Sequence, residues 1–207
     1  ITSQVTKRQW HDTFKFITSG RGVQTSSGSL LHTLVVPGEG AYIFGSDDHG
    51  GSWYLVETPV RPADESKIVQ LANGKWMVNS RVNGSGVRYI HVSDDKGKSW
   101  KSWPDSILSD PGCNASLIRY SLKDNGTDKE LLIFSNANTS DRRENMCIRV
   151  SEDDGMSWTE GKTIYPGSSA YSSVDILSNG NIGVLFEKDD YSEIVFASLP
   201  VEWILKK

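Results

Sequence analysis

Three acidic octapeptides are the residues whose types and spacing first suggest chemistry in this sequence. They share the pattern S-x-D-x-G-x-S-W and lie at Ser46–Trp53, Ser93–Trp100 and Ser151–Trp158. Carboxylates spaced in this way could bind calcium, but the twelve-residue ladder of oxygen ligands that ends in Glu is missing. We therefore expect structural turns here, and we expect neither a metal site nor a cofactor.

The octapeptides have the composition of tight hairpin turns. The aspartate at the third position can accept hydrogen bonds from nearby backbone N–H groups, and the glycine at the fifth position supplies φ > 0. The closing tryptophan can pack the turn against a sheet. Their first residues, 46, 93 and 151, are 47 and 58 positions apart, which is about the length of one four-stranded propeller blade.

Short apolar runs bounded by Gly, Asn, Ser and Asp surround these turns and are typical of strands. Together they divide the chain into four predicted blades, at residues 20–60, 64–105, 113–163 and 169–205. The only helix expected is a short one around residues 201–207. The predicted fold is all-β, a β-propeller of four-stranded blades. Four blades are the low end of what closes a ring, so the chain is either a small propeller or part of a larger one.

The composition excludes several classes of protein. With 207 residues, of which 37% are hydrophobic, the chain can bury a core and is not disordered. A net charge of −4 argues against binding to nucleic acid or anionic membranes, and no apolar run reaches the roughly 20 residues of a membrane span. Two cysteines are too few for a disulfide scaffold, and Cys113 and Cys147 could either pair or remain reduced.

Three further motifs follow one another along the chain. The first runs from Asp64-Glu65 through an Asn-Gly turn to Arg81, sixteen residues after the glutamate. The second leads from Phe134-Ser135-Asn136 to Arg143-Glu144-Asn145, and the third joins Ala170-Tyr171-Ser172-Ser173 to Leu185-Phe186-Glu187. In this order they resemble the C-terminal part of a sialidase (neuraminidase) catalytic domain. The octapeptides resemble the Asp boxes of the same family.

The resemblance implies that residues 1–207 are the C-terminal portion of a single sialidase propeller, whose full form has six blades and nearly twice this length. The family's first arginine and its aspartate acid/base have no counterpart in this sequence. The implied partners are sialylated glycoconjugates and the missing N-terminal propeller portion, with no nucleic acid and no membrane span. Because such substrates lie outside cells, a secreted, periplasmic or cell-surface protein is implied.

The resemblance also implies an activity, that of an exo-α-sialidase, a retaining glycosidase that releases terminal sialic acid. Arg81 and Arg143 would clamp the substrate's carboxylate with charge-assisted hydrogen bonds. Arg143 is preferred to its neighbour Arg142 because it keeps the R-x-N spacing. Tyr171 would be the nucleophile and Glu65 its base, since a carboxylate nucleophile would be repelled by the substrate's own carboxylate.

Glu187 is the fifth residue that the resemblance assigns to the site, in a supporting role. The equivalent glutamate in the family braces the first arginine, so Glu187 would be unpaired unless another segment supplies that group. Two alternatives stay open: a trans-sialidase or intramolecular trans-sialidase, which would share these residues, and a non-catalytic sialic-acid-binding propeller. The coexistence of Tyr171 with Glu65 favours an enzyme, because anion binding alone needs no activated phenol.

Overall fold

The chain consists mainly of β-strands, which confirms the all-β class predicted from the sequence. The computed structural model describes residues 1–124 and 127–206, and these divide into two compact units. The first unit comprises residues 1–83 and 88–105, and the second comprises residues 84–87 and those from 106 onward.

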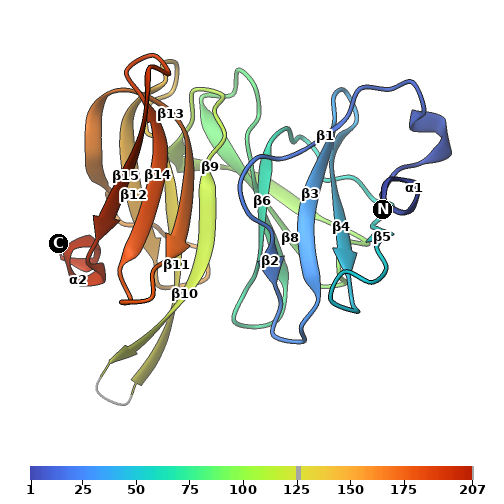
Figure 1. Cartoon of the computed structure of the whole chain (residues 1–207), viewed down its shortest axis with the longest axis horizontal. Helices are drawn as coiled ribbons and strands as arrows, with labels where there is room; N and C mark the ends of the chain where they lie inside the picture. The colour runs from blue at the N-terminus through green and yellow to red at the C-terminus, as the bar shows by residue number, and fades with distance from the viewer. Residues whose placement is uncertain (125–126, 207) are drawn as a thin grey trace. The chain divides into compact units, whose positions relative to one another are not determined.

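Two sheets lie wholly or mostly in the first unit, and their strands are labelled in Figure 1. In the first sheet the neighbours are, in order, β1 (Phe16–Ile17), β3 (Leu30–Val36), β4 (Gly40–Ser46) and β5 (Tyr54–Leu55), and β2 (Val23–Gln24) also pairs with β3. In the second sheet they are β6 (Ser66–Gln70), β7 (Trp76–Ser80), β8 (Val87–Ser93) and β9 (Lys101–Ser109). Two short turns of helix, α1 (Thr2–Val5) and the 3-10 turn η1 (Arg8–Trp10), precede the first sheet.

Strand β4 is buried along its whole length because each of its faces contributes to a different hydrophobic core. Ala41 and Ile43 point to one face and pack in a core with side chains of β6 and β7. Tyr42 and Phe44 point to the other face and pack with Trp10. The alternation of side chains along a strand therefore ties the N-terminal turns to one side of the sheet and the second sheet to the other.

The second unit is built on six strands in chain order. They are β10 (Ser116–Asp124), β11 (Thr127–Ala137), β12 (Glu144–Ser151), β13 (Lys162–Ile176), β14 (Ile182–Lys188) and β15 (Glu193–Leu199), and α2 (Val201–Leu205) follows them. The predicted C-terminal helix is thus present over residues 201–205, and Lys207 lies outside the described residues.

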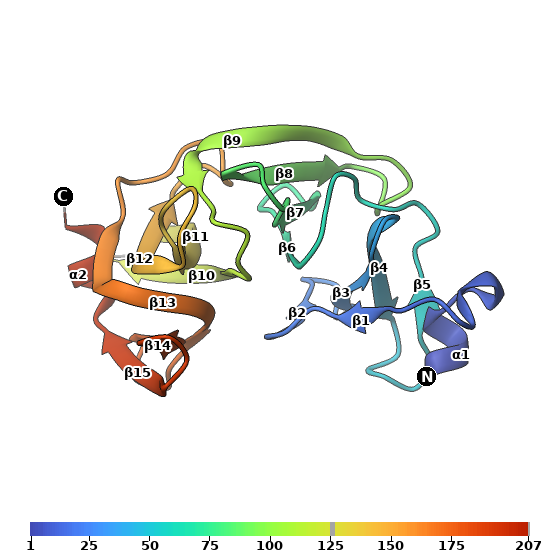
Figure 2. The ribbon, with the colours of Figure 1, turned by 90° about the horizontal axis from the view of Figure 1, so that it is seen from above.

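Strand β13 is shared between two antiparallel ladders. Its first half pairs with β12, and its second half, from Ser169, pairs with β14 after a shift of register. Figure 2 shows the curvature of this long strand. The ladder that ends the chain accordingly has three strands, and residues 162–168 belong to the preceding ladder, so that one continuous strand passes from the first ladder to the second between residues 168 and 169.

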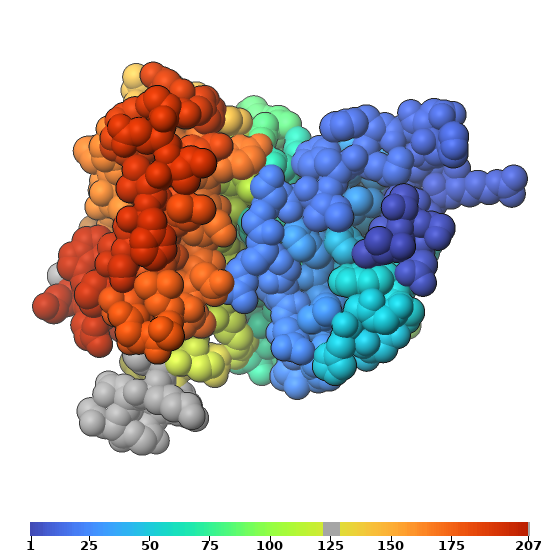
Figure 3. Space-filling model, in the orientation of Figure 1, coloured from blue at the N-terminus to red at the C-terminus, as the bar shows by residue number. Residues whose placement is uncertain are grey.

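One face of β14 and β15 carries apolar side chains that are exposed to solvent. Leu185 pairs with Phe196, and Ile194 lies two residues before Phe196 on the same face. Their exposed fractions are 45%, 58% and 72%, respectively. We call these three residues the β14–β15 apolar face; the strands that carry it lie on the surface drawn in orange and red in Figure 3.

Each octapeptide forms the same hydrogen-bonded turn. In the second one, the Ser93 hydroxyl donates to Asp95 Oδ1 at 2.7 Å and accepts from the backbone N–H of Gly97. The other half of the turn is held by Ser99, whose N–H and hydroxyl donate to the two carboxylate oxygens of Asp95. Lys96 and Gly97 both have positive φ, 58° and 84°, which explains why glycine is needed at the fifth position. The same bonds recur around Asp48 and Asp153.

No helix within residues 1–124 and 127–206 is both long and apolar enough to cross a membrane. Cys113 and Cys147, which the sequence left as either bonded or reduced, are two buried thiols and form no disulfide.

The octapeptide turns lead to a prediction about acid stability. Hydrogen bonds from Ser99, Ser93 and the backbone lower the pKa of Asp95 to about 2. A carboxylate with a lowered folded pKa stabilises the protein above its unfolded pKa, and this contribution is lost as the pH falls toward 2. We expect Asp95→Ala to lower the thermal unfolding midpoint by a few degrees at pH 7, and the deficit to shrink between pH 4 and pH 2.

Asp94→Ala is the matched control, because Asp94 is the exposed neighbour of Asp95 in the same turn. Differential scanning calorimetry of the three proteins as a function of pH measures the effect. Equal midpoints for the Asp94 and Asp95 variants at pH 7 would contradict the assigned role of the carboxylate.

Candidate active site

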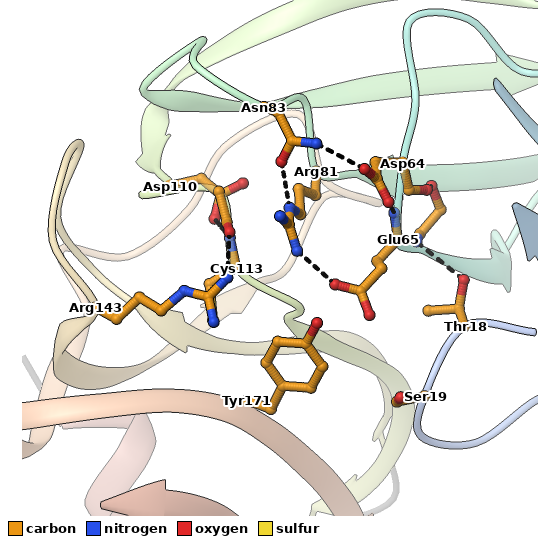
Figure 4. A network of polar contacts seen from close by, with 12 residues as sticks. Thr18, Ser19, Asp64, Glu65, Arg81, Asn83, Asp110, Cys113, Arg143 and Tyr171 are labelled. Carbon is orange, nitrogen blue, oxygen red and sulfur yellow. Dashed lines mark hydrogen bonds and ion pairs between the residues drawn. The ribbon is translucent and has the colours of Figure 1, made fainter. Parts of the chain in front are cut away.

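In the first unit, Glu65 and Arg81 meet where two paired strands end. Ser66 pairs with Ser80 at the end of the β6–β7 ladder, and the Arg81 N–H extends that ladder by donating to the Glu65 carbonyl at 3.0 Å. The side chains then form an ion pair, with Arg81 Nη1 2.7 Å from Glu65 Oε2. The sixteen-residue spacing in the sequence is therefore one hairpin, and its two ends face each other (Figure 4).

Two further residues fix the orientation of this pair. Arg81 Nε donates to Asn83 Oδ1 at 2.6 Å, and the Asn83 amide donates to Asp64 at 2.7 Å. Asp64 in turn accepts the backbone N–H of Glu65 at 2.8 Å. Figure 4 shows the resulting chain of contacts from Asp64 through Asn83 to Arg81. The role of Asn83 was not predicted, although its position two residues after Arg81 is the signal that could have suggested it.

A buried lysine follows Glu65 by two residues, on strand β6. Lys67 is only 3% exposed, and its ammonium group donates to the carbonyl of Ser19. Burial, together with repulsion from the nearby Arg88 guanidinium, lowers the pKa of Lys67 to about 7. Because residues two apart on a strand point to the same face, Glu65 and Lys67 share one electrostatic environment, in which the carboxylate favours the charged form of the lysine.

In the second unit, an irregular stretch of backbone determines the direction of the Arg143 side chain. Asn145 has φ of 62°, and the register of the β12–β13 ladder shifts next to it. The Asn145 side chain is held by a bond to the Asn138 carbonyl and by the Thr163 hydroxyl, which donates to it at 2.9 Å. This R-x-N segment directs Arg143 away from its neighbour Arg142, whose side chain is 73% exposed.

Arg143 lies against Tyr171 and is held by two uncharged acceptors. Its guanidinium carbon is 5.7 Å from the centroid of the Tyr171 ring. One nitrogen donates to the Gly112 carbonyl and another to the Tyr191 hydroxyl, both at 2.9 Å. Burial lowers the pKa of Arg143. Electrostatic interactions with Cys113, Tyr191 and Tyr171 and the hydrogen bond to Tyr191 raise it by more, so that the pKa of Arg143 is raised overall.

Tyr171 lies at a bulge of strand β13, opposite Glu187. Ser169 pairs with Lys188 and Ser172 with Phe186, so two residues of β13 face one of β14. The backbone N–H of Tyr171 donates to Glu187 Oε2 at 2.9 Å. Among the described residues, Glu187 forms no ion pair.

A polar pocket of about 240 Å³ lies beside these residues in the second unit. Arg143, Ser169, Glu187 and Tyr191 are among the side chains that line it. Within the described chain, the hydroxyl of Ser169 is buried and has no hydrogen-bond partner. The pocket therefore offers a carboxylate and a hydroxyl to a cation, with a guanidinium at its edge for an anion.

The structure thus brings the five predicted residues together as two groups. Glu65 and Arg81 form an ion pair in the first unit, and Arg143, Tyr171 and Glu187 are neighbours in the second. Their catalytic roles stay predictions. Residues 1–124 and 127–206 contain no group of three or more His, Cys, Asp and Glu side chains that could hold a metal ion.

The Glu65–Arg81 pair leads to a prediction about stability. The Glu65 side chain is 5% exposed, so removal of its partner would leave a buried carboxylate without its main counter-charge. We expect Arg81→Met to destabilise the chain by about 3 kcal/mol. Adding Glu65→Gln should recover part of this loss. Urea unfolding of the two single variants and the double variant gives the coupling energy, and strictly additive effects would rule out the pair as a stabilising unit.

Lys67 leads to a second prediction, about the pH dependence of stability. Its pKa is about 7 in the folded protein against 10.5 for the unfolded chain, so the unfolded chain binds more protons between these values. Stability therefore rises with pH from about 7 to above 10. We expect Lys67→Met to be more stable relative to wild type at pH 6 than at pH 10, by on the order of a few kcal/mol.

The control for this comparison is Lys75→Met, because Lys75 is exposed in the turn of the same hairpin. The packing lost with the Lys67 side chain is the same at both pH values, so the difference between the pH values reports the change in charge of the group that donates to Ser19. Urea unfolding at pH 6 and pH 10 measures it. A difference no larger than that of the control would mean that Lys67 stays charged when folded.

Comparisons with known proteins assign the chain to a family. The BNR repeat-like domain model matches residues 3–184. A sialidase of Micromonospora viridifaciens is 34% identical over 203 residues, covering 92% of this chain and 31% of that protein. A sialidase of Bacteroides fragilis strain YCH46 is 31% identical and covers 100% of this chain and 39% of that protein. The chain thus spans only about a third of the length of these curated relatives.

Solved structures agree with this assignment. The Hadza microbial sialidase Hz136 has a TM-score of 0.88 at 28% identity, with 98% of this chain and 40% of that chain covered. A leech intramolecular trans-sialidase has a TM-score of 0.77 at 25% identity, with coverage of 92% and 32%. The β-propeller class expected from the sequence is therefore that of its structural neighbours. The chain belongs to the BNR repeat-like domain family, and within that family it is a sialidase domain.

Proposed function

We propose that the chain carries part of the active site of an exo-α-sialidase that releases terminal sialic acid from glycoconjugates with retention of configuration. The observation that carries the proposal is the Arg143 guanidinium lying against the Tyr171 ring in a chain of the sialidase family. An arginine beside a tyrosine at a strand bulge supplies both an anion clamp and a nucleophile. The three octapeptides are, in this proposal, the Asp boxes of the family.

The substrate is recognised through its carboxylate. Sialic acid carries this group on its anomeric carbon, and guanidinium groups bind planar anions with paired, charge-assisted hydrogen bonds. Arg143 and Arg81 supply two such groups. The uncharged partners of Arg143 support its role, because they leave its positive charge available to the ligand.

Tyr171 and Glu65 perform the first chemical step. The phenol oxygen attacks the anomeric carbon, the bond to the leaving alcohol breaks, and Glu65 takes the phenolic proton. Phenol is a poor nucleophile at its ordinary pKa of about 10, so this transfer is what activates it. The leaving oxygen takes a proton from an acid. Water then attacks the anomeric carbon of the glycosyl-tyrosine intermediate and gives a proton to the conjugate base of that acid, while Glu65 returns its proton to the departing phenolate. Sialic acid is released, the phenol is restored, and two displacements at one carbon give retention.

Glu187 braces a third arginine that another part of the longer protein supplies. Its carboxylate and the unpartnered Ser169 hydroxyl both line the polar pocket of the second unit, which is suited to a guanidinium group. This supporting role follows the resemblance to the family. The pocket then serves to orient the third member of the clamp.

The activity requires residues beyond 1–207. The family's first arginine and its acid have no counterpart here, and proton transfer by a positioned acid contributes about 10² to 10⁴ in rate. The β14–β15 apolar face supports a further sheet in the longer protein, because exposed apolar side chains of this size mark contact surfaces. The purified chain 1–207 is accordingly inactive or very weak, and ready hydrolysis of a natural sialoside by it would overturn this point.

An intramolecular trans-sialidase is the second candidate, favoured by the likeness to the leech structure. Both enzymes would use the same tyrosine, and they differ in whether water or a hydroxyl of the sugar itself attacks the intermediate. Mass spectrometry of the product separates them, since free sialic acid indicates hydrolysis and an anhydro sugar indicates the intramolecular reaction. Substrates of either enzyme lie on glycoconjugates outside cells, so we propose a secreted, periplasmic or cell-surface protein.

Replacement of Tyr171 by phenylalanine tests the nucleophile. In the full-length protein that contains this chain, we expect Tyr171→Phe to lower kcat for a fluorogenic sialoside by about 10³-fold or more. Binding of sialic acid should remain within a fewfold of wild type, because Arg143 is unchanged. The measurement combines initial rates with calorimetric titration.

Tyr54→Phe is the control for this test, since Tyr54 is a half-buried tyrosine of the first unit outside the site. Its kcat should equal that of wild type. Unchanged turnover in Tyr171→Phe would eliminate the tyrosine nucleophile, and sialic acid binding without turnover in the wild-type protein would favour a non-catalytic binding propeller.

A further inference from the structure

The connection between β14 and β15 contains an unusual backbone conformation. Asp189, Asp190 and Tyr191 have φ of 48°, 52° and 67°, so three successive residues other than glycine adopt the left-handed region. Side chains with a Cβ atom disfavour this region, and a run of three is rare. Such strain persists only where surrounding contacts impose it, and it is concentrated at functional sites.

The contacts that impose this conformation come from strand β13. The Ser168 carbonyl accepts the N–H of Asp189 at 2.9 Å, and the Ser168 hydroxyl donates to the Asp190 carboxylate at 2.8 Å. The Asp189 carboxylate accepts hydrogen bonds from Lys188 and Tyr165, which lower its pKa. Hydrogen bonds to both aspartates therefore hold the turn, and they fix the direction of the residue that follows, Tyr191.

That residue is Tyr191, whose hydroxyl has a hydrogen-bond partner while its ring is exposed to solvent. The side chain is 57% exposed, so the position is not selected for burial of the aromatic group. Its hydroxyl accepts a hydrogen bond from Arg143 Nη1 at 2.9 Å, while Nη2 of the same guanidinium donates to the Gly112 carbonyl. Two contacts on different nitrogens fix the plane of the guanidinium, which one contact would leave free to rotate.

We propose that Tyr191 is a positioning residue, which orients the Arg143 guanidinium to receive the substrate's carboxylate. The inference rests on the proposed function. A neutral phenol is suited to this task, because it orients the cation without competing for its charge, as a carboxylate partner would. The clamped turn provides the rigidity that bidentate recognition of an anion requires.

The experiment uses Tyr191→Phe in the full-length protein, because this change removes only the hydroxyl of an exposed ring. We expect KM for a fluorogenic sialoside and Kd for free sialic acid both to rise about tenfold, with kcat altered much less. The thermal midpoint should stay within about one degree of wild type, because the ring gains and loses little burial. Tyr54→Phe, which removes a phenol that is not a hydrogen-bond partner of Arg143, should leave KM and Kd unchanged.

A second variant separates positioning from folding. Ser168→Ala removes the clamp on Asp190 and leaves the Tyr191 hydroxyl in place, so it should raise KM and Kd in the same direction by a smaller factor. Wild-type KM and Kd in Tyr191→Phe would overturn the positioning role while the proposed function stands. A rise in KM and Kd that occurs only together with a lower thermal midpoint would mean that Tyr191 has a structural role and no positioning role. A wild-type protein that neither binds nor hydrolyses sialosides would overturn the function and the positioning role together.

Discussion

Antiparallel register at the ends of two hairpins is the constraint on which the rest of the structure depends. In the first unit it sets Glu65 opposite Arg81, and in the second it sets Tyr171 opposite Glu187. A slip by one residue would turn every side chain of a strand to the other face. The register is maintained by buried apolar positions within the ladders, such as the pairing of Val174 with Val184, and not by the polar residues at their ends. The candidate site residues therefore lie at the ends of ladders whose stability comes from buried apolar positions.

The two arginines of the site are stabilised in different ways. Arg81 is compensated by a carboxylate that is itself almost fully buried, so the pair is held by mutual charge neutralisation. Arg143 has a carbonyl and a phenol as its partners and keeps its charge uncompensated. In the proposed function, this difference would let a protein with a net charge of −4 attract an anion, because the attraction would be local to one guanidinium.

Two kinds of turn with positive φ occur in this fold, and they are stabilised in different ways. The octapeptide turns are local devices, in which a serine and an aspartate satisfy each other and nearby N–H groups within eight residues, and glycine relieves the strain. The turn at Asp189–Tyr191 has no glycine, and its contacts come from β13, about twenty residues earlier in the chain. The hydrogen bonds of the first kind lie within the octapeptide, whereas those of the second join the turn to a different strand.

The sequence by itself determined the all-β class, the positions of the turns and the order of the site motifs. These properties follow from local causes, since strands need alternating apolar residues and the octapeptide turn needs its own serine, aspartate and glycine. It also indicated that Glu65 and Arg81 belong together, because one hairpin separates them. The tertiary structure decided what depends on distant contacts: that β13 serves two ladders, that Arg143 and not Arg142 meets Tyr171, and that Tyr191 reaches Arg143. No local pattern marks these features, because a bulge or a strained turn without glycine is stable only when strands distant in sequence hold it.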